Sequence, residues 1–157
     1  MLSYAQSLLG VPYRWWHKGE LCLGDEPPFY AADGPPPSAP PALNCAGFIN
    51  CIARFAGRPI PGVDAGLWYA GGTYAWYEEL APKCDVIKSI DKLTPGALLL
   101  RRYRDEADQG HLGVVWTDGR IIHCWPDKGV VIEEMPADYF EYVCVDWLEK
   151  IENMACL

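Results

Sequence analysis

The sequence predicts an α+β domain in which helices come first and a small antiparallel sheet follows. Apolar residues recur at helical spacing in the first half, whereas the second half changes to short apolar runs separated by turn signals. A chain of 157 residues that is 50% hydrophobic is long enough to bury one core. No internal repeat and no linker divides the sequence, so we expect a single domain over residues 1–157.

Three segments carry the helical pattern. Residues 2–9 place apolar side chains near helical spacing and are followed by a glycine and a proline, which end the helix. Residues 45–56 form a longer apolar face, with Asn44 as a good N-cap and Gly57 as a good stop. Residues 73–80 predict a third, weaker helix.

A proline-rich segment precedes the second helix. Periodicity disappears from residue 11 to residue 43, and residues 27–41 hold seven of the fourteen prolines. Such a run favours polyproline and turn conformations over helix or central strand. We expect a surface loop inserted at about residues 17–43, and loops of this length are usually functional or mobile.

Two histidines lie in predicted strands on either side of one turn. The predicted strands cover residues 97–100, 111–116, 120–124, 130–133 and 142–146. A two-residue turn at 118–119 would put His111 and His123 on opposite faces. An odd loop, 117–119, with Gly119 in the left-handed conformation, makes them diagonal neighbours on one face.

Cys45 has the position that a nucleophilic cysteine needs. It follows the predicted N-cap Asn44, where the helix dipole favours a thiolate and unpaired backbone N–H groups can stabilise an oxyanion. Cys51, more than a turn further along, has neither benefit. Of the three histidines, His111 and His123 can share a face, whereas His17 is expected in an exposed loop. Together these residues indicate thiol-based catalysis.

Composition excludes several other classes. The formal charge of −8 argues against nucleic acid or an anionic membrane as partner, and no apolar run is long enough to span a bilayer. The N-terminus has no signal-peptide pattern, so we expect synthesis in the cytosol. Seven cysteines without C-x-x-C predict neither a disulfide framework nor a zinc site, and we expect no metal or cofactor. Cys144 in particular fits a buried apolar position.

Five short segments, in order, resemble motifs of the NlpC/p60 family of papain-like cysteine peptidases, which are cell-wall hydrolases. Residues 9–15 (LGVPYRW) resemble L-G-x-P-Y-x-W, and residues 44–48 (NCAGF) resemble D-C-S-G-F. Residues 93–96 (LTPG) resemble L-x-P-G, residues 111–115 (HLGVV) resemble H-V-G-I-Y, and residues 119–123 (GRIIH) match G-x-x-I-H.

The resemblance implies a papain-like fold, with the nucleophile helix packed on a small antiparallel sheet. It also implies a triad in which Cys45 is the nucleophile, His111 the base and His123 the residue that orients the imidazole. Tyr13 would lie beside the oxyanion site, and Trp15 would contact the substrate. The implied activity is hydrolysis of amide bonds in peptidoglycan stem peptides, of the D-glutamyl-diaminopimelate type.

Two departures from the family pattern bear on specificity. Asn44 replaces an aspartate and Ala46 a serine, and in many members those residues bind the free amino end of the stem peptide. The sequence therefore leaves open an amidase, deamidase or acyltransferase with a non-wall substrate, and a non-catalytic binding module. A wall substrate would call for a route such as lysis, a phage particle or injection, and the alternative is action on wall fragments recycled in the cytosol. The sequence does not predict the oligomeric state.

Overall fold

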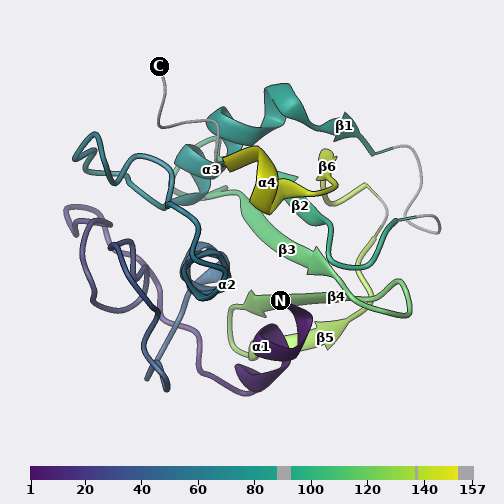
Figure 1. The fold of residues 1–157 in the computed structure, drawn as a ribbon, viewed down its shortest axis with the longest axis horizontal. Coiled ribbons are helices and arrows are strands. Elements are labelled where there is room, and N and C mark those ends of the chain that lie inside the picture. Colours follow the sequence, from purple (N-terminus) through teal and green to yellow (C-terminus); the bar gives the residue numbers. More distant parts are fainter. Residues whose placement is uncertain (88–92, 137, 152–157) are drawn as a thin grey trace.

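Helices surround a six-stranded antiparallel sheet with strand order β1-β6-β2-β3-β4-β5 (Figure 1). The structure is a computed structural model that describes residues 1–87, 93–136 and 138–151. The helices are α1 (Leu2–Ser7), α2 (Cys45–Phe55), α3 (Thr73–Leu80), α4 (Trp147–Ile151) and the 3-10 helix η1 (Ala81–Lys83). The strands are β1 (Asp85–Val86), β2 (Leu98–Arg101), β3 (His111–Val115), β4 (Ile121–Trp125), β5 (Gly129–Glu133) and β6 (Tyr142–Cys144). The predicted α+β class is confirmed, and the sequence patterns do not predict β1, η1 or α4.

Helix α2 is the centre of the molecule. It packs on β3 and β4 and also contacts α1, which lies near β5 in Figure 1. Because strand side chains alternate between faces, Leu112 and Val114 of β3 join the main apolar core with α2. Val115 belongs instead to a smaller cluster that includes Ile121 and Phe140. By the same alternation, His111 lies on the face of Val115.

The register of β3 against β4 decides where the histidines lie. Val114 pairs with Ile122, so residues 117–119 form the odd loop between the strands. Gly119 has φ +85°, in the left-handed region that such a loop requires. Of the two alternatives that the sequence left open, the structure has the odd loop, which places His111 and His123 on the same face.

The proline-rich insertion is held against α2 by Arg54. The Arg54 side chain is 2% exposed, and its guanidinium pairs with the Asp25 carboxylate at 2.7 Å. The same guanidinium donates to the carbonyl oxygens of Tyr30, Gly34 and Pro35 at 2.8, 3.0 and 2.7 Å. Residues 29–31, in the middle of this segment, are buried in the core. The expectation that the whole segment is a surface loop is therefore wrong for these residues.

A second buried polar residue of α2 holds two loops together. The Asn50 amide donates to the carbonyl oxygens of Phe29 at 2.7 Å and Gly71 at 3.0 Å. The insertion also approaches the helix backbone, because a Cβ at Gly47 would overlap the Pro28 carbonyl. A glycine is therefore required at this turn of α2.

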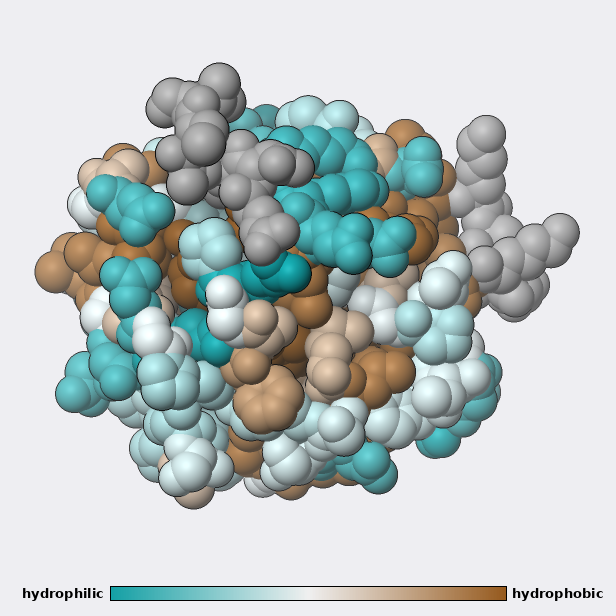
Figure 2. All heavy atoms as spheres, viewed as in Figure 1, coloured by the Kyte–Doolittle hydropathy of each residue, from teal (hydrophilic) through white to brown (hydrophobic). Residues whose placement is uncertain are grey.

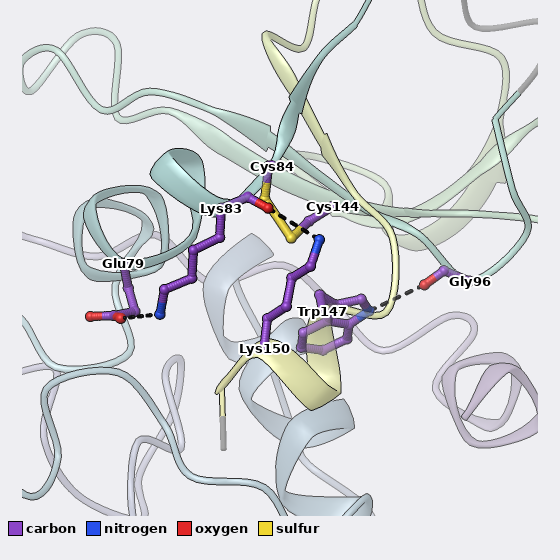
Figure 3. The surroundings of a disulfide bond; sticks show 7 residues. All are labelled: Glu79, Lys83, Cys84, Gly96, Cys144, Trp147 and Lys150. Carbon is purple, nitrogen blue, oxygen red and sulfur yellow. Dashed lines mark hydrogen bonds and ion pairs between the residues drawn. A yellow bond between two sulfur atoms is a disulfide. The ribbon is translucent and has the colours of Figure 1, made fainter. Parts of the chain in front are cut away.

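A disulfide joins Cys84, just after η1, to Cys144 at the end of β6 (Figure 3). Their Cα atoms are 4.7 Å apart across a sequence separation of 60. The sequence did not predict this pair, although the prediction that Cys144 is buried is confirmed. The hydrogen bonds drawn around it run from Trp147 to the Gly96 carbonyl, from Lys150 to the Lys83 carbonyl, and from Lys83 to Glu79.

Apolar surface is visible in several places on the face shown in Figure 2, including the left end, where Figure 1 draws the loops that precede α2 and α3. The segment before α2 meets the segment before α3 through the Cys22 N–H, which donates to the Trp68 carbonyl at 3.2 Å. Leu21 and Trp68 are 70% and 59% exposed. No helix in the described ranges has the length and apolar character to cross a membrane.

Candidate active site

The start of α2 positions Cys45. The Asn44 side chain accepts a hydrogen bond from the Gly47 N–H at 2.7 Å, as an N-cap does, so the helix begins at Cys45. The predicted cap is confirmed. Cys45 is 6% exposed, and its small open area lies in a cleft of about 760 Å³.

The pKa of Cys45 is shifted upward, whereas its position at the start of a helix predicts a downward shift. Burial raises the pKa of the Cys45 thiol to about 11, and this outweighs hydrogen bonds from the Leu112 and Ala46 backbone N–H groups, which favour the thiolate. At neutral pH the group is therefore a thiol. Nucleophilic attack by Cys45 requires a base that removes the proton.

His111 and His123 form a hydrogen-bonded pair. His111 Nε2 and His123 Nδ1 lie 2.7 Å apart, and the two side chains are almost completely buried. Burial, followed by the charges of His123 and Arg101, holds the pKa of His111 well below its usual range. A neutral His111 keeps a lone pair at neutral pH and can accept a proton.

Glu133 lies behind the histidine pair and was missed by the sequence analysis. On β5, Val131 pairs with His123, and Glu133 is two residues further along the same face. Glu133 Oε1 is 3.1 Å from His123 Nε2, and its other carboxylate oxygen is ion-paired with Lys128. The sequence did contain a sign of it: Glu133 is a charged residue in the predicted strand 130–133, two residues from Val131 and therefore on the same face of the sheet.

Aromatic rings enclose the two imidazoles. The Trp125 ring centroid lies 5.0 Å from that of His111 and 5.3 Å from that of His123. Tyr139 and Phe140 each lie 5.8 Å from His111. Exclusion of water by these rings strengthens the hydrogen bond between the histidines. The sequence analysis did not select Trp125 or Tyr139.

The cleft brings together most of the residues selected from the sequence. Six of them line it: Tyr13, Trp15, Asn44, Cys45, Ala46 and His111. His123, which is fully buried, is not among the lining residues and lies behind His111. His17 is exposed, as expected. Within the described residues, no group of His, Cys, Asp and Glu side chains is arranged to hold a metal ion.

The cleft has two walls of different origin. The loop wall consists of residues that precede α2 or α3: Tyr13, Trp15, Trp16, Cys22, Phe29, Trp68 and Tyr69. The sheet wall consists of residues on or beside β3 and β4 together with Tyr139: Arg102, Tyr103, Arg104, Asp108, Gln109, His111, Trp125 and Tyr139. The loop wall is mainly aromatic, whereas the sheet wall combines charged, polar and aromatic side chains.

Tyr13 lines the same cleft as Cys45. Burial, followed by the neighbouring charge of the Cys45 thiolate, raises the pKa of Tyr13 above its usual range. The phenol therefore stays protonated and remains a hydrogen-bond donor. Its ring packs edge-on against Trp15 with centroids 5.1 Å apart.

The two positions that depart from the family pattern, Asn44 and Ala46, are both buried at the floor of the cleft. The Asn44 side-chain oxygen is already used by the Gly47 N–H. The side chain of Asn44 is neutral, so this end of the cleft supplies no negative charge from these two residues.

Solved structures with a similar fold are NlpC/p60 proteins. One, from Bacillus cereus ATCC 10987, has a TM-score of 0.54 and 17% identity over 92% of this chain and 38% of its own. Another is RipD from Mycobacterium tuberculosis, described as a non-catalytic NlpC/p60 domain protein adapted to peptidoglycan binding; it has a TM-score of 0.51 and 14% identity, covering 92% of this chain and 93% of its own. No protein-family model and no curated protein matches the sequence. The resemblance inferred from the motifs is confirmed at the level of the fold.

Proposed function

We propose that the protein is a thiol-dependent amide hydrolase that acts on peptides derived from peptidoglycan. The observation that carries this proposal is that Cys45, at the start of a helix, and His111, whose Nε2 is paired with His123, line the same cleft. A nucleophile, a base and a third group that orients the base are the parts that covalent acyl transfer requires.

The chemistry begins with a neutral thiol and a neutral imidazole. His111 accepts the Cys45 proton as the sulfur attacks the substrate carbonyl, and the oxyanion that forms is stabilised by the Cys45 backbone N–H and the Tyr13 hydroxyl. Collapse of this intermediate breaks the C–N bond, and His111 returns the proton to the leaving amine. Water then attacks the thioester with His111 as base again, which releases the acid and restores the thiol.

The substrate assignment is supported by the fold and by the size of the cleft. A fold similar to that of RipD, described as adapted to peptidoglycan binding, makes wall peptides the first class to test. A cleft of about 760 Å³ accommodates several residues of a peptide. Tests with muropeptides should begin with the D-glutamyl-diaminopimelate bond.

A second candidate is transfer of an acyl group to an acceptor other than water, or cleavage of a non-wall amide. Asn44 and Ala46 favour it, because they lack the groups that bind a stem peptide's amino end in many members of the family. The aromatic loop wall also suits an apolar substrate or acceptor.

The deciding experiment incubates the protein with purified muropeptides and identifies the products by mass spectrometry. Cleaved stem peptides, absent with the C45A variant, support hydrolysis. Products whose mass includes an added amine acceptor support acyl transfer. Tight muropeptide binding without any product in wild type would contradict both and indicate a binding protein.

A further inference from the structure

Glu133 is the far end of a chain of hydrogen bonds that reaches His111. Its carboxylate contacts His123 Nε2 through Oε1 and Lys128 through Oε2. Burial opposes ionisation of Glu133, but hydrogen bonds from Lys128 and His123 outweigh burial and hold its pKa below its usual range. At neutral pH Glu133 is a carboxylate, which can only accept hydrogen bonds.

Because Glu133 can only accept, it fixes the donor and the acceptor in both hydrogen bonds, the one to His123 and the one between His123 and His111. His123 Nε2 must carry the hydrogen that it donates to Glu133, so Nδ1 of the neutral ring has the lone pair. His123 Nδ1 then accepts from His111 Nε2. A neutral His111 protonated at Nε2 keeps its lone pair at Nδ1, and this nitrogen is free to take the proton of the nucleophile.

Without an acceptor behind His123, the opposite direction is equally allowed. His123 Nδ1–H would donate to His111 Nε2, and His111 would then be protonated at Nδ1. The two nitrogens would still lie 2.7 Å apart, and the pair would look unchanged. However, His111 would have no lone pair at Nδ1 and could not accept the thiol proton.

We propose that Glu133, held by Lys128, is a positioning residue that sets the tautomer of both His123 and His111 and so makes His111 a base. The role rests on the proposed hydrolase function but has a separate readout, the tautomer itself. Lys128 fixes the second carboxylate oxygen, so the remaining oxygen stays directed at the imidazole. When His111 becomes protonated, the same carboxylate stabilises the charge through His123.

Nitrogen-15 NMR of the imidazoles in the wild-type protein tests this directly, because protonated and unprotonated ring nitrogens have well-separated chemical shifts. The expected result near pH 7.5 is a protonated Nε2 and an unprotonated Nδ1 in both His111 and His123. A His123 ring protonated at Nδ1 would overturn the proposal without any variant being made.

The E133Q variant keeps the shape of the side chain but replaces a pure acceptor by an amide that can also donate. We expect its His123 signals to shift toward the Nδ1-protonated form, and kcat to fall roughly ten- to a hundredfold with little change in KM. The matched control is E134Q, which changes an exposed carboxylate at the neighbouring position and should leave tautomers and kcat unchanged.

The outcomes separate the two proposals. If E133Q keeps wild-type tautomers and wild-type kcat, the role of Glu133 is wrong and the hydrolase function stands. If the wild-type protein cleaves no amide, the hydrolase function fails, and the wild-type and E133Q tautomers still decide whether Glu133 sets the ring polarity. Near-UV circular dichroism shows that E133Q is folded before either comparison.

Discussion

The sheet wall and the loop wall of the cleft are held in place in different ways. On the sheet side, His111, His123 and Glu133 come from three adjacent strands, and backbone register fixes their spacing. On the loop side, the segment before α2 is fixed through backbone carbonyls that bind two buried polar side chains of α2, Arg54 and Asn50. The positions of the two histidines and Glu133 therefore depend on pairing between strands, and the aromatic loop wall depends on a few long-range hydrogen bonds.

This difference predicts that mutations on the two walls affect different properties, activity on the sheet side and stability on the loop side. A change of a catalytic side chain on the sheet wall removes chemistry and leaves the backbone intact, because the ladder does not use side chains. A change of Arg54 does the reverse, since it removes the anchors of the loop wall without touching a reacting atom. The predictions below test that division, from the largest expected effect to the smallest.

The largest effect is expected for the chemical groups themselves. C45A and H111A should each lower kcat/KM by about 10⁴-fold or more, because triad members act as a unit. The thermal midpoint should change little for C45A, since only one sulfur is lost. Muropeptide turnover followed by mass spectrometry gives the rate. A C45A protein with more than a tenth of wild-type activity would contradict the assignment of the nucleophile.

R54M should destabilise the protein strongly while the sheet wall keeps its geometry. The variant removes the donor of four backbone carbonyls, those of Tyr30, Asp33, Gly34 and Pro35, and we expect a loss of about 3–5 kcal/mol in the free energy of unfolding. Urea denaturation measures it. R120M is the matched control, because Arg120 is exposed and pairs locally with Asp118.

In folded R54M, the imidazole tautomers should match those of wild type. A change in those signals would show that the two walls are coupled, against the division proposed here. A loss below about 1 kcal/mol would show that Arg54 is not a main anchor of the loop wall.

Mild acid should weaken the sheet wall selectively. The pKa values of His111 and His123 are lowered in the folded state, so the unfolded chain binds protons first as pH falls. Their contribution is complete above the usual histidine value of 6.5 and is lost progressively below it. We expect the free energy of unfolding to fall by up to about 1.4 kcal/mol per pH unit for each histidine. Urea midpoints between pH 7.5 and pH 5 check this.

H123N should show a shallower decline over the same pH window, because one titrating ring is gone. H17N is the control, since His17 is exposed, and should follow the wild-type curve. Equal slopes for H123N and wild type would mean that the acid sensitivity comes from elsewhere.

The smallest effect is expected for the substrate's amino end. Asn44 is neutral and its oxygen is engaged by the Gly47 N–H, so it cannot supply the charge-assisted bond that favours an ammonium. Such a bond is worth ~1.5–3 kcal/mol, or roughly ten- to a hundredfold. We therefore expect kcat/KM for a stem peptide and for its N-acetylated form to agree within about tenfold. A preference above roughly a hundredfold for the free amine would show that another residue supplies the charge.

The sequence predicted the sheet wall better than the loop wall, for a physical reason. Alternation and turn chemistry are local, so neighbouring residues reduced the loop at Gly119 to two possible lengths and showed that the odd one would bring His111 and His123 to one face. Glu133 required the register of a third strand, which was not worked out. The cap at Asn44 is also local and was correct.

The anchors of the loop wall have no local signal. Arg54 binds carbonyls 19 to 24 residues away, and a backbone carbonyl is present at every position whatever the side chain. The disulfide between Cys84 and Cys144 spans 60 residues and is hidden in an odd total of cysteines. The raised pKa of Cys45 depends on burial by distant segments, so the helix position alone gave the wrong sign.

That disulfide sets a redox requirement on the nucleophile. One molecule must hold Cys84 and Cys144 oxidised while Cys45 stays reduced, although oxidants and other disulfides attack any accessible thiolate. Burial raises the pKa of the Cys45 thiol to about 11, so at pH 7 the group keeps its proton, and with 6% exposure it gives oxidants little access. Burial of Cys45 as a thiol thus protects it from oxidation, and in the proposed mechanism the reactive form arises only when His111 removes the proton.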